Sequence, residues 1–209
     1  LRENFGQFSS MSQETSDDLT LFTTKMQKAG ISADTTARFM TTASKSFGMG
    51  VEQTKKYQLE LFGFAKANGI STKVIADGLN SVMPRLAAFG KEGPRIFKDL
   101  AFASKNLGIE MGKLLDITEQ FTTFEGAAEA AGNLNAVLGG NYIDTLELLR
   151  AANEDPMKAM DMLRGTLEKT GKSFDQLDNQ TKRMFADIMK QDLDTTSKMF
   201  SKTSLLLVK

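Results

Sequence analysis

The chain has 209 residues, of which 41% are hydrophobic, and its basic and acidic residues balance at 26 each. This length can bury one sizeable core or two smaller ones, and a net charge of zero provides no field that attracts nucleic acid or an acidic membrane surface. The absence of cysteine and histidine excludes a disulfide framework and removes the usual ligands of zinc, copper and haem.

After an N-terminal helical lead-in over residues 1–28, a glycine followed by an aliphatic residue and a helix-starting residue recurs along the chain. The first, third and fourth of these glycines are 39 residues apart; the set is Gly30, Gly50, Gly69 and Gly108. Glycine takes the left-handed conformation that ends a helix, the aliphatic residue packs back on that helix, and the next Ser or Glu opens another. We predict a positive φ at the three evenly spaced glycines.

The apolar pattern between these glycines also recurs. When the 39 residues that follow Gly30 (the first block) are aligned with the 39 that follow Gly69 (the second block), five positions of the first correspond to five apolar positions of the second. They are Thr36, Ala37, Met40, Ala43 and Phe47, which correspond to Ile75, Ala76, Leu79, Val82 and Leu86. This spacing describes one face of an amphipathic helix. It predicts a repeat-like array of helical hairpins with a period of about 39 residues over residues 29–124. The cluster from Gly90 to Pro94 marks a further helix boundary in this array.

Small side chains dominate the start of the last predicted region, residues 125–209. Six of them lie within seven positions: Gly126, Ala127, Ala128, Ala130, Ala131 and Gly132. Small residues let another helix approach closely, so we take these six as a candidate contact between chains. The alternative is an Ala-rich helix packed on its own domain.

Helix signals continue to the end of this region. Gly139 and Gly140 end the small-residue helix, Asp155 and Pro156 begin a later one, and Ser173 with Gln176 forms a capping box. Two last helices are predicted near residues 181–190 and 194–202. Because hairpin signals and clusters of β-branched residues are missing, we predict an all-α fold with roughly ten helices and no sheet.

Carboxylates are the main remaining source of chemistry. Glu125 and Glu129 are four residues apart, but a solvated helix face explains them better than an acid–base pair. Asp187, Asp192 and Asp194 lack the spacing and the glycine of a calcium loop. The segment from Gly165 to Ser173 looks like a phosphate-binding loop, yet it has five residues between its glycines where that loop has four. We therefore predict no catalytic residue, no cofactor and no metal site.

Several stretches together resemble bacteriophage tail tape measure proteins. They are the Gly-Ile-Ser and Leu-Gly-Ile turns, Ala-Ala-Gly-Asn-Leu-Asn-Ala-Val-Leu-Gly-Gly at 130–140 and Leu-Leu-Arg-Ala-Ala-Asn-Glu-Asp-Pro at 148–156. The resemblance covers residues 29–170 and transfers no catalytic residue. It implies a helical virion protein that helps to set tail length and occupies the tail tube or tip until the genome leaves. The 17 glycines interrupt any heptad run, so the resemblance implies a folded segment and not the extended rod.

The same resemblance implies a homo-oligomer around the tube axis that contacts tail tube, tail tip or baseplate proteins. It implies no sequence-specific binding to nucleic acid and no membrane span in this segment. Because the chain begins at Leu1, we expect it to be part of a longer protein. Two alternatives remain: a helical-repeat adaptor that binds a peptide or a helix, and part of a wall-degrading tail enzyme.

Overall fold

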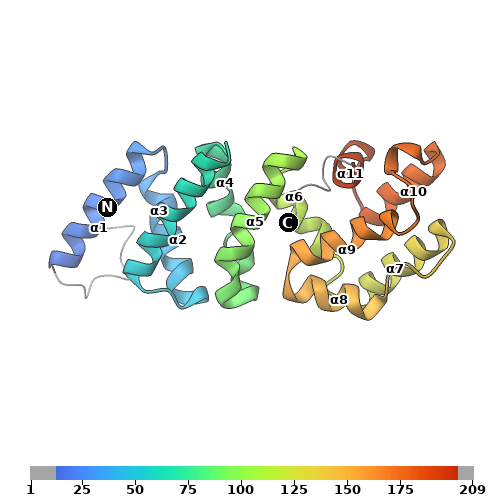
Figure 1. Ribbon diagram of the computed structural model, residues 1–209. Coiled ribbons are helices and arrows are strands. Elements are labelled where there is room, and N and C mark those ends of the chain that lie inside the picture. The colour runs from blue at the N-terminus through green and yellow to red at the C-terminus, as the bar shows by residue number, and fades with distance from the viewer. Residues whose placement is uncertain (1–12, 202–209) are drawn as a thin grey trace. The chain divides into compact units, whose positions relative to one another are not determined.

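The computed structural model describes residues 13–201, and over that range the chain folds into α-helices and short 3-10 helices without a strand (Figure 1). The all-helical prediction is therefore confirmed. The first 12 residues of the predicted lead-in and the end of the last predicted helix, Lys202, lie outside the described residues. No helix between residues 13 and 201 is both long and apolar enough to cross a bilayer.

The chain divides into two compact units, with the boundary between Ala101 and Phe102. In unit 1, the central helix is α2, which packs against α1, α3, α4 and η2. Its elements are α1 (Gln13–Lys28), α2 (Ala33–Phe47), α3 (Val51–Ala67), α4 (Thr72–Ser81), η2 (Arg85–Glu92) and the first part of α5 (Gly93–Leu107). The predicted lead-in belongs to this unit, because α1 contributes buried side chains to one cluster with α2: Leu19, Phe22, Met26, Ile31 and Met40.

Unit 2 is built on a run of three consecutive helices, in which α8 packs against α7 and α9. Helix α10 packs on α7 and α11, and α6 packs on α9. Its elements are α6 (Met111–Glu119), α7 (Phe124–Leu138), α8 (Thr145–Glu154), α9 (Pro156–Glu168), η3 (Phe174–Gln176), α10 (Asn179–Met189) and α11 (Leu193–Phe200). The sequence placed a boundary after residue 124, whereas α6 and α7 here share one unit.

The glycine turns have the predicted backbone. Gly30, Gly69 and Gly108 have φ values of 90°, 64° and 64°. The residues after the first two glycines donate their N–H groups back to the helices just completed, Ile31 to Met26 O at 2.9 Å and Ile70 to Ala65 O at 2.8 Å. These bonds satisfy carbonyls that the helix end leaves free.

The second turn of the series differs from the prediction. Gly48, with φ 66°, ends α2, while Gly50 has φ −70° and is the N-cap of α3. The Gly50 N–H donates to Gln53 Oε1 at 3.0 Å, so this glycine begins a helix where the sequence interpretation had it end one. Only Gly50 matched the expected signal, because Gly48 is followed by Met49 and Gly50 and not by an aliphatic residue and a helix-starting residue.

The segments between the glycines are unequal in length. The first block contains two long helices, α2 and α3, whereas the second contains the shorter α4, the 3-10 helix η2 and then α5. A kink interrupts η2 at Gly90, which has a φ of 51° and a ψ of −127°, three residues before α5 begins at Gly93. The turn recurs as predicted, but the elements between the turns do not repeat in kind.

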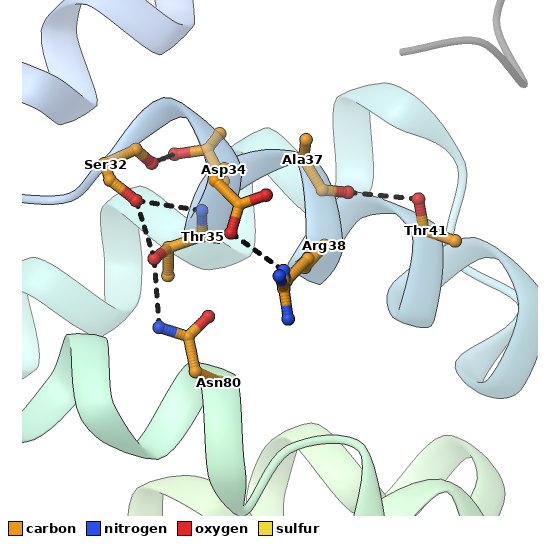
Figure 2. Close-up of polar contacts among 8 residues, drawn as sticks. Ser32, Asp34, Thr35, Ala37, Arg38, Thr41 and Asn80 are labelled. Carbon is orange, nitrogen blue, oxygen red and sulfur yellow. Dashed lines mark hydrogen bonds and ion pairs between the residues drawn. The ribbon is translucent and has the colours of Figure 1, made fainter. Parts of the chain in front are cut away.

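A polar contact joins the start of α2 to α4 within unit 1 (Figure 2). Ser32 Oγ accepts the Thr35 N–H at 3.0 Å and so caps α2. From α4, Asn80 Nδ2 donates to Thr35 Oγ1 at 3.0 Å. Because the cap residue and the partner helix share this threonine, the contact fixes the position of α4 against the first turn of α2.

Candidate functional site

The small-residue stretch lies in α7, and half of its members are buried inside the chain. Ala127, Ala130 and Ala131 are between 0% and 3% exposed on a helix that packs against α8 and α10. Their small size is thus explained by close packing within unit 2. The prediction that these three residues contact another chain is therefore corrected: they pack within the core of unit 2. Ala128 is partly exposed and Gly132 is exposed.

The need for glycine at position 126 is also explained by a contact within the chain. A Cβ atom at this position would lie 1.9 Å from the carbonyl oxygen of Gln120. Gln120 is itself held in place, because its Nε2 donates to Met189 O of α10 at 3.0 Å. Only glycine allows this approach of the turn to α7. The candidate contact between chains is therefore reduced to Ala128 and Gly132.

The acidic residues considered from the sequence stand on exposed surfaces. Glu125 and Glu129 are both exposed, as are Asp187, Asp192 and Asp194. Asp192 caps α11, because its Oδ1 accepts the Thr195 N–H at 2.7 Å and its Oδ2 accepts the Thr195 hydroxyl at 2.9 Å. These bonds to the ionised form lower the pKa of Asp192. Between residues 13 and 201 no three acidic side chains converge as metal ligands would.

The two stretches that resemble the tape measure family meet in one substructure of unit 2. The side chain of Asn135 in α7 closes the loop before α8: its Oδ1 accepts the N–H groups of Tyr142 and Ile143 at 2.8 and 3.1 Å, and its Nδ2 donates to Ile143 O at 2.9 Å. At the other end of α8, Asn153 Nδ2 donates to Thr122 O at 3.0 Å. Two asparagines therefore clamp both ends of the α7–α8 hairpin.

A hollow of about 590 Å³ lies on α8, α9 and the loop before them. Its lining combines a largely apolar surface with charged groups of both signs: Tyr142, Ile143, Glu147, Arg150, Lys158, Asp161, Met162, Gly165 and Lys169. Two of its cations are already engaged, since Lys158 pairs with Glu154 at 3.2 Å and Lys169 donates to Tyr142 O at 2.8 Å. The arrangement offers neither a nucleophile with a base nor a set of ligands that would define a reaction.

A second hollow, of about 300 Å³, is lined by residues of α9, the turn after it and Phe200, and its lining includes a buried arginine. Arg164 is 6% exposed, and its Nη1 lies 3.8 Å from Asp161 Oδ1. Burial lowers the pKa of the Arg164 guanidinium, and the nearby carboxylates oppose that shift. Burial likewise raises the pKa of Asp161, which Arg164 opposes. Among the described residues of unit 2, Arg164 is the charged residue that is buried, while Asp161 is partly exposed.

The sequence interpretation missed Arg164, although a signal was present. It follows Leu163 and stands four residues after Met160, so helical periodicity places it at the edge of the apolar face of α9. A cation at such a position is either paired or exposed to a cavity. The residues after it, singled out for their likeness to a phosphate loop, form the end of α9 and a turn at Gly171, whose φ is 72°.

Comparisons with protein-family models, with curated proteins and with solved structures give no match to this chain.

Proposed function

We propose that the chain is a folded helical segment of a bacteriophage tail tape measure protein, which acts by assembly and placement in the tail tube or tip. The support is the resemblance in the sequence, together with the part that its residues play in the fold. Asn135 and Asn153 come from the two stretches that carry the resemblance, and both clamp the α7–α8 hairpin. The family-like residues are thus those that hold this hairpin together.

A placement role agrees with how the polar groups of this hairpin are used. Asp144 caps α8 by accepting the N–H groups of Leu146 and Glu147 at 2.8 and 2.9 Å, and Asp155 caps α9 by accepting the Met157 N–H at 2.9 Å. These carboxylates stabilise helix ends. A protein that works by its shape needs defined helix ends and no reactive group.

Cryo-electron microscopy of the intact particle tests the proposal. The expected result is density for this segment inside the tail tube or at its tip, with a copy number that matches the symmetry around the tube axis. A position on the outside of the tube would overturn the proposal. A short chain found free in the cytoplasm and bound to a peptide would favour the adaptor instead.

A variant in α7 tests the expected contact between copies. Replacing Ala128 with leucine adds a large side chain at a partly exposed position, so we expect normal folding and a reduced yield of particles. The matched control is Lys56→Leu, which adds leucine at a position of α3 that is 80% exposed. Equal particle yields for the two variants, with unchanged melting temperatures, would remove the contact at Ala128.

A further inference from the structure

The buried arginine of α9 is incompletely paired. Arg164 is 6% exposed, and its Nε has no hydrogen-bond partner among residues 13–201. The distance of 3.8 Å from Nη1 to Asp161 Oδ1 is longer than a hydrogen bond. A buried charged donor without an acceptor is costly, and a guanidinium offers five N–H groups in a planar fork.

Arg164 also lines a hollow that is already formed. Arg164 lines the cavity of about 300 Å³ together with two apolar residues, Leu167 and Phe200. The ring of Phe200 is held by two other phenylalanines, with centroid distances of 5.7 Å to Phe174 and 5.1 Å to Phe185. One wall is therefore a rigid aromatic surface.

The turn after α9 also lines the cavity, and it forms hydrogen bonds within itself. Ser173 N–H donates to Gln176 Oε1 at 2.9 Å, and Thr170 Oγ1 donates to Leu167 O at 2.6 Å. Lys172 and Glu168 also line the cavity, so its charged groups are two cations and one carboxylate. Asp161, whose Oδ1 lies 3.8 Å from Arg164 Nη1, offsets the excess of one positive charge in this lining, so the cavity suits at most a monoanion and opposes a dianion.

We propose that this cavity binds the carboxylate of a small organic acid, with the guanidinium of Arg164 facing the carboxylate and the apolar part of the ligand against Leu167 and Phe200. A planar carboxylate matches the planar guanidinium, and hydrogen bonds between charged groups are about twice as strong as neutral ones. A volume near 300 Å³ is at the lower end of ligand cavities, which limits the ligand to a small molecule. The site does not depend on the proposed role in the tail.

The test is a titration of the 209-residue chain with three probes, followed by amide NMR and by thermal melting. Sodium benzoate should bind with a dissociation constant on the order of 1 mM and shift the amides of Gly171, Lys172 and Ser173. Benzamide has the same shape without the charge and should bind at least about tenfold more weakly. Inorganic phosphate should also bind more weakly than benzoate, because of Glu168.

Two variants test whether benzoate binding depends on Arg164. Arg164→Met keeps an unbranched buried side chain and should weaken benzoate binding by at least about tenfold. The control Lys158→Met removes a cation from the other hollow and should leave the affinity unchanged. Equal binding of benzoate and benzamide to the unaltered chain would overturn the proposal without reference to any variant. Tighter binding of phosphate than of benzoate would also overturn it, as would full benzoate affinity in folded Arg164→Met.

Discussion

Two glycines of α7 should respond in opposite directions to the same substitution. Gly132 is exposed in the helix interior, and a Cβ atom there would meet nothing within 4 Å. An interior glycine costs a helix about 0.5–1 kcal/mol relative to alanine, because its backbone loses more freedom on folding. Gly132→Ala should therefore raise the free energy of unfolding by about that amount.

Gly126→Ala starts from the same gain in helix propensity but meets backbone. The new Cβ atom would lie 1.9 Å from Gln120 O and 3.1 Å from its carbonyl carbon. A carbonyl cannot rotate away as a side chain can, and Gln120 is also bonded to Met189 O at 3.0 Å. The turn must shift, and such overpacking costs about 1–3 kcal/mol. We expect a net loss of at least about 1 kcal/mol.

Far-ultraviolet circular dichroism is a suitable assay, since the chain is helical and has no tryptophan. For a unit of roughly 100 residues, 1 kcal/mol corresponds to about 4–8 °C in the melting temperature. Gly132→Ala should melt above the unaltered chain and Gly126→Ala below it. If Gly126→Ala melts at or above the temperature of the unaltered chain, the close approach of Gln120 to α7 is wrong; if Gly132→Ala melts below it, the open space around Gly132 is wrong.

Three other substitutions test the caps and the core. Gly108→Val should cost on the order of 1 kcal/mol or more because φ is 64°, whereas the helical control Gly112→Ala, with nothing within 4 Å of the new Cβ, should not destabilise; urea titrations compare them. Asp192 has a pKa below its ordinary 3.8 in the folded chain, so the stability that its ionised side chain contributes is present above pH 3.8 and is lost as the pH falls through the folded pKa. In thermal melts below pH 3.8, the Asp192→Asn variant should therefore lose less stability than the unaltered chain. Tyr57→Phe should cost about 0.5–1.5 kcal/mol in the same titrations, because it removes the buried hydrogen bond of 2.7 Å that the Tyr57 hydroxyl donates to the Pro94 carbonyl.

The sequence predicted the features that depend on neighbouring residues. A left-handed glycine, a capping Asp155 and a proline in the first helical turn each satisfy backbone groups within a few positions. The structure confirms the three evenly spaced glycines, the cap at Asp155 with Pro156 in the first turn, and the capping box of Ser173 and Gln176.

Features that depend on distant residues could not be predicted in the same way. The helix pattern of α7 does not say which neighbour covers Ala127, and the cover comes from α8 and α10. The break after α4 does have a local signal that the sequence interpretation did not use, because Pro84 lacks the N–H that would continue the helix; the burial of Val82, Met83 and Leu86 at 0% or 1% exposure is what the fold adds. The sequence places Arg164 at the edge of the apolar face of α9, but only the fold shows that its Nε is buried and has no hydrogen-bond partner among residues 13–201.

Substitutions on the outward side of α7 can distinguish an effect on the stability of the chain from an effect on assembly. Its buried small residues are explained by packing within unit 2, but Ala128 and Gly132, one helical turn apart on the same side, meet no such demand. A glycine there lowers the stability of the isolated chain and permits close approach by another helix. If another copy covers this side, Gly132→Ala should stabilise the isolated chain and yet reduce the yield of particles. A variant that is more stable and assembles normally would show that the outward glycine serves no contact.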